Sequence, residues 1–238
     1  MTPLQRLRLE KAGSDCGFEM TAVPQAEGLA LRSARFPELV QVRVAGTEAF
    51  EVSASDPSVL GVDAAGGAIA VMGYGDLYAV LRKAAAYART KPNRVADEFK
   101  RQTASMPRST EAERIVVQRV GQGIFRSAVL DYWQGRCCVT GLDMPELLKA
   151  SHIRPWASCD TDEQRLDVFN GLLLTPHLDA LFDSGLMTVE DSGLVRLAAA
   201  VTPERRLLLG LQRDMAVAGL RVEHRAYLQF HRATVWKG

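Results

Sequence analysis

Histidine, the side chain best suited to proton transfer near neutral pH, is confined to the second half of the chain. All 4 histidines follow residue 151, and Asn170, one of the two asparagines, lies between the first two of them. Asp179 and Asp183 are four residues apart on a segment with helical periodicity, so both carboxylates share a helix face and could hold one hard cation. The grouping predicts a base beside a metal. The histidines are His152, His177, His224 and His231.

Hydrolysis of a phosphodiester is a reaction that such a site could serve. The reaction needs a water nucleophile activated near neutral pH, and it needs compensation of the charge on the phosphoryl oxygens and the leaving group. A histidine with an unperturbed pKa of about 6.5 can supply the first, and a bound cation can supply the second. One histidine and one metal ion therefore suffice.

Three stretches of sequence around these residues resemble the HNH endonuclease family. They are RCCVTGL from Arg136, ASHIRPW around His152, and RLDVFNGLLLTPHLDALFDSG around Asn170. They are similar to the branch of the family with an S-H-I-x-P-W and N-G-L-L-L signature. The resemblance covers residues 112–237, because the segments QGIFRSAVLDYW and HRAYLQFHRATVW are also similar to that branch. It implies a ββα-metal fold, in which a β-hairpin is followed by a metal-binding helix.

The resemblance also implies a role for each motif residue. His152 is the expected general base, which takes a proton from the attacking water. Asn170 is the expected brace of the hairpin and orients that base. His177 is the third motif residue by order and is predicted to take part in catalysis and in metal binding, although helical phase places it half a turn from Asp179.

The expected metal is one divalent ion. Asp179 and Asp183 stand at the distances from Asn170 at which colicin-type nucleases of the family place their helix ligands, and His177 is the third predicted ligand. Ser151 stands where many members carry an Asp or His ligand, and its hydroxyl is a weaker ligand unless it acts through water. Mg²⁺ or Mn²⁺ is expected, with Zn²⁺ or Ni²⁺ as alternatives.

Each of these residues also has a purely structural interpretation. A histidine on a strand is often a partly buried polar residue, the Asn-Gly pair at 170–171 could be a simple turn, and Asp179 and Asp183 could be ordinary exposed acids. The alternative function is a non-catalytic nucleic-acid-binding module that retains a degenerate HNH fold. The intact His152 and Asn170 favour the enzyme, a metal-dependent HNH endonuclease that hydrolyses DNA in restriction or in defence against foreign DNA.

The elements of the second half must position these side chains. Helical periodicity covers 112–134, with an expected interruption near Gly121 and Gly123, and β-prone segments surround Cys138 and Ile153. A short helix is predicted over 176–184, because Thr175 can cap it, a proline suits its first position and a glycine follows its end. A hairpin with its turn at 191–193 follows, and another helix begins at 203.

The first half has a different pattern. From 17 to 71, short β-prone runs alternate with turn residues, and Val40, Val42 and Val44 alternate with polar residues as a half-buried strand requires. A helix is predicted over 75–91. The predicted fold class is therefore α+β, a small sheet-plus-helix module followed by the ββα-metal domain. The predicted domains are an N-terminal recognition or regulatory module at 1–105, a linker at 106–111 and the nuclease domain at 112–238.

The net charge of +1 conceals a basic segment. Residues 82–108 carry eight Lys or Arg against Asp97 and Glu98, and Arg94, Lys100 and Arg101 are the predicted DNA contacts within it. The alternative for such a run is a solvated helix face.

Composition limits the class of protein. With 47% hydrophobic and 24% charged residues, the chain is typical of a globular protein rather than a collagenous or disordered one. It has no apolar run of about 18 residues and no signal-peptide pattern, so a cytoplasmic location without membrane contact is expected. The expected partner is DNA, with a homodimer as one option, and the 4 cysteines are expected to be reduced thiols.

Overall fold

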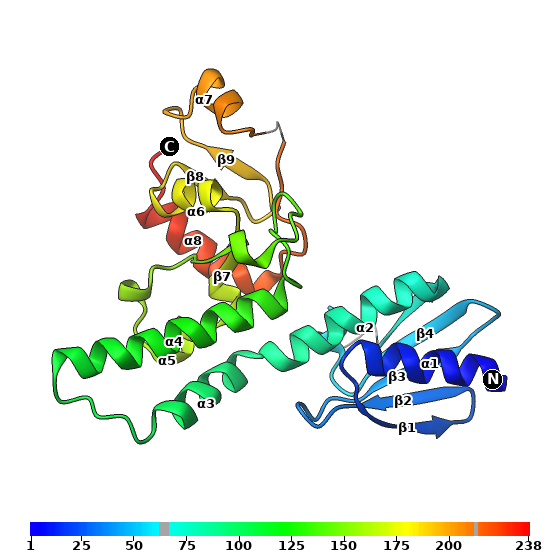
Figure 1. Cartoon of the computed structure of the whole chain (residues 1–238). Coiled ribbons are helices and arrows are strands. Elements are labelled where there is room, and N and C mark those ends of the chain that lie inside the picture. The colour runs from blue at the N-terminus through cyan, green and yellow to red at the C-terminus, as the bar shows by residue number, and fades with distance from the viewer. Residues whose placement is uncertain (62–66, 212–213) are drawn as a thin grey trace. The chain divides into compact units, whose positions relative to one another are not determined.

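The computed structural model describes residues 1–61, 67–211 and 214–238. The chain forms two compact units, Met1–Arg89 and Thr90–Gly238, and each is described by itself (Figure 1). The first unit contains an antiparallel sheet whose strands pair in chain order, and the second contains two hairpins among helices. The α+β prediction, with a sheet and helices in the N-terminal half, is confirmed.

Two helices flank the sheet of the first unit in the sequence. Helix α1 (Pro3–Asp15) precedes its strands, and α2 (Gly73–Thr90) follows them. Helix α1 contacts β1 and β2, and Leu77 and Leu81 of α2 are fully buried. Val40 and Val42 are also buried while Gln41 and Arg43 are exposed, so the predicted alternation is confirmed. The elements are α1 (Pro3–Asp15), β1 (Met20–Gln25), β2 (Gly28–Arg32), β3 (Val40–Val44), β4 (Ala49–Ala54), the 3-10 turn η1 (Pro57–Leu60), β5 (Ala68–Met72) and α2 (Gly73–Thr90).

The second unit is built around the hairpin of β6 and β7, and α6 follows directly after β7. The helices are α3 (Pro92–Thr103), α4 (Glu111–Tyr132), α5 (Asp162–Leu166), α6 (Pro176–Asp183), α7 (Pro203–Leu208) and α8 (Arg225–Thr234). The strands are β6 (Lys149–His152), β7 (Gly171–Leu174), β8 (Met187–Val189) and β9 (Val195–Leu197). The 3-10 turns are η2 (Pro145–Leu147), η3 (Trp156–Ser158), η4 (Val168–Asn170) and η5 (Val222–His224). No helix in these described residues is long and apolar enough to cross a membrane.

Helix α3 packs against α4 and α5, so it is part of the second unit. Residues 106–111, predicted as an interdomain linker, connect α3 to α4 inside that unit. Helix α3 is not among the elements predicted from the sequence, where the predicted helix ends at residue 91 and Pro92 follows. Proline at the first position of a helix costs no hydrogen bond, and here it begins one.

The predicted interruption of the long helix near Gly121 and Gly123 is wrong, since α4 is continuous from Glu111 to Tyr132. Gly121 is required by close packing instead: a Cβ there would lie 2.8 Å from Cη2 of Trp156 and 3.2 Å from Cε2 of Phe99. The glycine therefore lets α4 approach α3 and the segment after β6.

Two further predictions from local sequence need correction. The segment around Cys138 forms a turn rather than a strand, although the Cys138 N–H still donates to the carbonyl of Leu173 in β7. Thr175 is the N-cap residue of α6, but its buried hydroxyl makes no hydrogen bond, so it does not cap the helix through its side chain. Gly185 does follow the end of α6 with a φ of 73°, as the predicted helix end requires.

Two of the histidines, His224 and His231, are buried in the core. His231 stacks on Phe182 with ring centroids 3.9 Å apart, and its ring nitrogens bond to Thr188 and to the Phe182 carbonyl. His224 is fully buried against the rings of Tyr132, Trp133 and Phe169, and burial lowers its pKa to about 4.

His224 is expected to make the fold sensitive to acid. The unfolded chain binds a proton at this residue below an ordinary pKa of about 6.5, whereas the folded chain resists protonation until about 4, so the unfolding free energy falls as the pH drops between these values. The expected loss from this residue is about 3 kcal/mol by pH 4. Urea unfolding at pH 7 and pH 4.5 should show a smaller loss in His224→Phe than in the unmodified protein. An equal loss in both proteins would contradict the assignment.

Candidate active site

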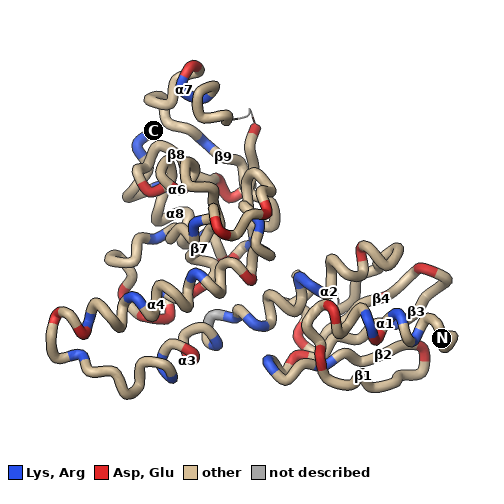
Figure 2. The backbone as a smooth tube through the Cα atoms, in the orientation of Figure 1, with Lys and Arg blue, Asp and Glu red and all other residues tan. Residues whose placement is uncertain are grey.

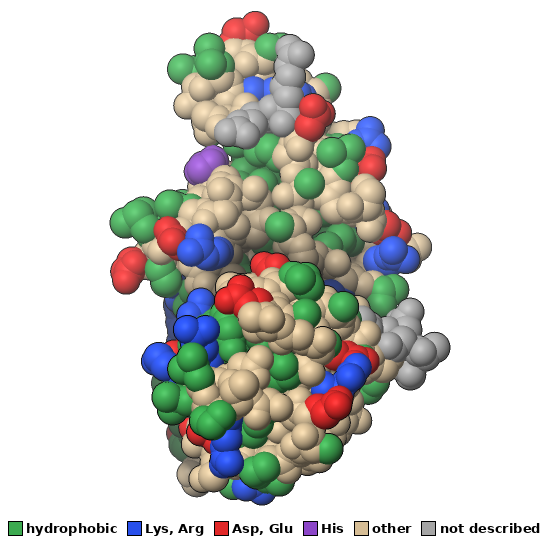
Figure 3. Space-filling model, turned by 90° about the vertical axis from the view of Figure 1, so that its right-hand side faces the viewer, with side chains coloured by type: hydrophobic (Ala, Val, Ile, Leu, Met, Phe, Trp, Pro, Cys, Tyr) green, Lys and Arg blue, Asp and Glu red, His purple; other side chains and the backbone are tan. Residues whose placement is uncertain are grey.

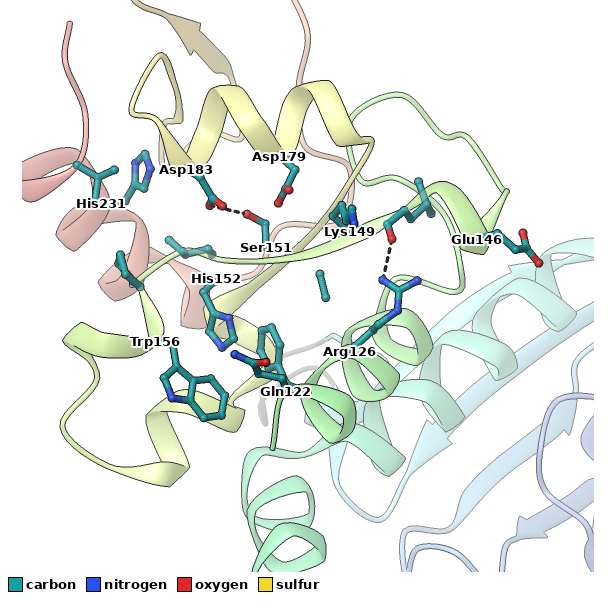
Figure 4. A pocket seen from close by; sticks show the side chains of 16 residues that line it. Gln122, Arg126, Glu146, Lys149, Ser151, His152, Trp156, Asp179, Asp183 and His231 are labelled. Carbon is teal, nitrogen blue, oxygen red and sulfur yellow. Dashed lines mark hydrogen bonds between the residues drawn. The ribbon is translucent and has the colours of Figure 1, made fainter. Parts of the chain in front are cut away.

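A pocket of about 670 Å³ lies against the hairpin strand β6, with α4 and α6 contributing the facing walls (Figure 4). Four residues singled out from the sequence line it: Ser151 and His152 from β6, and Asp179 and Asp183 from α6. The end of α8 and the residues just after it also contribute, through His231 and Val235. The hairpin thus brings together residues that are about 30 positions apart in the sequence.

Strand alternation sends Ser151 and His152 in different directions. In the antiparallel register, Ser151 pairs with Leu172 and His152 pairs with Gly171. The Ser151 hydroxyl donates to Oδ1 of Asp183 on α6 at 3.2 Å, whereas the His152 ring stacks on Phe125 of α4 with centroids 3.7 Å apart. Successive residues of a short strand therefore serve the two opposite walls of the pocket.

The hydrogen bond of His152 determines which ring nitrogen can act as a base. Nε2 lies 2.8 Å from the carbonyl oxygen of Arg165, and a carbonyl can only accept, so Nε2 carries the proton. Burial lowers the pKa of His152 to about 4, although the hydrogen bond to the Arg165 carbonyl acts to raise it. The ring is therefore neutral at pH 7. Nδ1 therefore keeps its lone pair, and it has no hydrogen-bonding partner within the described residues.

Asn170 holds the chain that follows His152. It is fully buried, its Oδ1 accepts from the Arg154 N–H at 2.7 Å, and its Nδ2 donates to the carbonyls of Arg154 and Gln164 at 3.2 and 3.1 Å. Gln164 is adjacent to Arg165, whose carbonyl oxygen accepts the hydrogen bond from Nε2–H of His152. The amide of Asn170 thus ties the segment just after β6 to the short helix α5, whose Arg165 carbonyl bonds to the imidazole.

The side chain of Arg165 reinforces the same segment. Its guanidinium donates to the carbonyl of Trp156 at 3.3 Å and to the carbonyl of Cys159, and it pairs with Asp162 at 3.1 Å. These bonds fix the loop between β6 and α5, so the carbonyl that bonds His152 belongs to a well-braced segment.

Asp179, Asp183 and Ser151 form a group of oxygen donors on the α6 side of the pocket (Figure 4). Partial burial and the negative charge of Asp179 raise the pKa of Asp183, while the Ser151 hydroxyl opposes this rise. A carboxylate whose charged form is destabilised by a neighbouring negative charge is a favourable setting for a cation. A set of oxygen donors suits a hard divalent ion such as Mg²⁺ or Mn²⁺.

The group falls short of a complete set of strong protein ligands. Across the described parts of the chain, no three His, Cys, Asp or Glu side chains come together in an arrangement that could hold a metal. The two aspartates, the Ser151 hydroxyl and water would have to complete the coordination of an ion. A site with few protein ligands is the usual situation for Mg²⁺, which keeps several of its waters.

His177 is not brought into this group. It is the second residue of α6 and does not line the pocket that Asp179 and Asp183 line. Two residues correspond to about 200° of rotation around a helix, so His177 and Asp179 leave the helix on different sides.

The three basic residues predicted to contact DNA also lie outside the pocket, on α3. Lys100 pairs with Glu163 of α5 at 2.8 Å, and Arg101 pairs with Glu98 on its own helix. Figure 2 shows both signs of charge along α3 and α4, and acidic and basic side chains are interspersed on the face seen in Figure 3.

Several pocket residues were not identified from the sequence. Gln122 and Arg126 come from α4, one helical turn apart, and Lys149 begins β6. The helical spacing of 122, 125 and 126 could have indicated that this face of α4 meets the site. Lys149 and Ser151 are two residues apart on one strand, so their side chains share a face. This spacing could have placed the lysine on the α6 side of the pocket.

Residues 137–190 match the sequence profile of a family described as HNH endonuclease, which confirms the predicted resemblance over that segment. The segment contains β6, β7 and α6 and every motif residue discussed above. A comparison with curated proteins found no match.

Proposed function

We propose that this chain is a metal-dependent endonuclease that hydrolyses phosphodiester bonds of DNA in the pocket between α4, β6 and α6. The observation that carries the proposal is the state of His152. Its Nε2–H is fixed on a backbone carbonyl and its Nδ1 is unprotonated, in a pocket whose other wall presents two aspartates and a serine hydroxyl. The match of this segment to HNH endonucleases supports the same chemistry.

In this proposal His152 accepts a proton from water at Nδ1. The Arg165 carbonyl continues to accept from Nε2–H and stabilises the positive charge that the ring acquires. Stacking on Phe125 and the bonds of Asn170 keep the ring and its carbonyl partner in place. Asp179, Asp183 and Ser151 would hold a divalent ion, which when bound supplies compensation for charge on the phosphoryl oxygens and the leaving group.

The metal proposed is Mg²⁺ or Mn²⁺, because the facing donors are oxygens. Zn²⁺ and Ni²⁺ prefer nitrogen or sulfur ligands, and the nitrogen ligand predicted from the sequence, His177, does not line the pocket. The ligand role of His177 remains a prediction, which a metal titration of His177→Ala would test.

The substrate proposed is DNA, and the biological role is restriction or defence against foreign DNA, with the sheet of the first unit supplying recognition. The described residues give no support to a homodimer, so none is proposed. Conversion of supercoiled plasmid to the open-circular form by the full chain, with Mg²⁺ or Mn²⁺ and blocked by EDTA, tests the activity. DNA binding without any conversion would favour the non-catalytic alternative.

The basic residues of α3 are expected to contribute to DNA affinity without taking part in the chemistry. Replacing Arg94, Lys100 and Arg101 with glutamine removes charge without placing a new carboxylate beside Glu163, the partner of Lys100. Binding of duplex DNA should weaken for all sequences, and the log–log salt slope should fall by about 0.9 for each phosphate that the variant no longer binds. Fluorescence anisotropy at several salt concentrations measures both quantities. An unchanged affinity and slope would identify α3 as a solvated helix face.

A further inference from the structure

The pocket is lined by both acidic and basic side chains, and the proposed chemistry gives a role to the two aspartates but none to the basic residues. Asp179 and Asp183 occupy the α6 wall, and Glu146 adds a third carboxylate. A DNA strand would bring further negative charge into the same space, on the scissile phosphate and on its neighbours. Such a site needs positive charge besides a bound ion, and only Arg126 and Lys149 among the lining residues carry it at neutral pH.

Arg126 is already engaged by the protein. One terminal nitrogen donates to the carbonyl of Leu148 at 2.7 Å and the other donates to the carbonyl of Pro145 at 3.0 Å. These bonds fasten the segment that leads into β6 to helix α4, and Figure 4 shows the first of them. The main effect of Arg126 is therefore to fix the backbone immediately before Lys149.

Lys149 is the pocket cation that remains available. It is the first residue of β6, its backbone is held by pairing with Leu174, and its side chain is exposed. Within the described residues its ammonium makes no ion pair or hydrogen bond, not even with the nearby carboxylates of the pocket. It shares strand parity with Ser151, which faces Asp183, so it lies on the side of β6 where the oxygen donors gather.

We propose that Lys149 is a substrate-binding residue whose ammonium contacts a phosphate oxygen of the DNA strand in this pocket. The proposal rests on the proposed function, since it takes DNA as the occupant. A lysine on a fixed strand presents a compact charge at the end of a flexible side chain. Such a group can reach a phosphate oxygen that lies close to a bound cation. The hydrogen bond from Arg126 to the Leu148 carbonyl fixes the backbone just before Lys149. His152 follows three residues after Lys149 on the same strand.

Binding can be measured without cleavage in a His152→Ala background. The comparison adds Lys149→Gln, Lys149→Arg or Lys237→Gln to that variant, and fluorescence anisotropy gives the affinity for a short duplex at several salt concentrations. Lys237 is an exposed lysine of the same unit that does not line the pocket, so it is the matched control. Lys149→Gln should weaken binding on the order of tenfold and lower the salt slope by about 0.9.

The other variants separate a specific contact from general charge. Lys149→Arg should keep the slope, because it keeps the charge at the same place, and Lys237→Gln should change neither quantity. An unchanged affinity and slope in Lys149→Gln, or an equal loss in Lys237→Gln, would overturn the assignment of Lys149. Failure of the His152→Ala parent to bind DNA would overturn the proposed function together with it. Binding by the unmodified protein without cleavage would overturn the nuclease proposal alone.

Discussion

Replacing His152 with alanine is expected to lower the rate of DNA cleavage by about 10²–10⁴-fold, the usual effect of losing a positioned general base. The atom that would accept the proton is Nδ1. It is the unprotonated ring nitrogen, because Nε2–H donates to the Arg165 carbonyl. Single-turnover cleavage of a defined duplex measures the chemical step without product release. Unmodified rates in the purified variant would contradict the role of His152.

Two controls distinguish a lost base from a damaged fold. The alanine leaves space beside Phe125, so added imidazole is expected to restore part of the rate, which a structural defect would not allow. The pH profile is the second control. Because the pKa of His152 is lowered to about 4, cleavage should stay nearly constant from pH 7 to about 5.5, whereas a base with the ordinary pKa of about 6.5 would lose activity over this range.

Replacing both Asp179 and Asp183 with asparagine is expected to abolish metal binding and, with it, cleavage. The readout that does not depend on activity is thermal stability. A ligand that binds only the folded state stabilises it by about 2.7 kcal/mol when its free concentration is 100 times Kd. Added Mn²⁺ should therefore raise the melting temperature of the unmodified protein and leave that of the double variant unchanged.

The matched control for the aspartates is Glu146→Gln, which removes a different carboxylate that lines the same pocket. It should keep the stabilisation by Mn²⁺, because Glu146 lies in η2, whereas the two aspartates lie on α6, where Asp183 accepts from the Ser151 hydroxyl. Equal stabilisation of the unmodified protein and the double variant would show that the metal binds elsewhere.

Patterns set by near neighbours in the sequence predicted much of the fold. Alternation identified β3, and Pro176 with Gly185 fixed the bounds of α6, because strand parity and helix ends depend on local backbone chemistry. Helix α1 is not predicted by periodicity, although Thr2 and Gln5 form a capping box at its start. Its low amphipathicity gives no clear period, so the cap was the signal available.

The site was only partly predictable for a different reason. The sequence could single out His152, Asn170 and the two aspartates, because their side-chain types suit the proposed chemistry. The Arg165 carbonyl could not, since every residue has a carbonyl and only the fold decides which one meets Nε2. The stacking of Phe125 on His152 depends likewise on how α4 packs against the hairpin.

Cleavage in H₂¹⁸O is the most direct measurement of the central claim, that water activated at His152 attacks a DNA phosphate. A duplex is incubated with the unmodified protein and Mn²⁺, and the terminal phosphate of the product is examined by mass spectrometry after a single turnover. We predict strand cleavage with one ¹⁸O in that phosphate, and loss of this product in His152→Ala. Cleavage without incorporation of the label, or no cleavage by the unmodified protein, would contradict the claim.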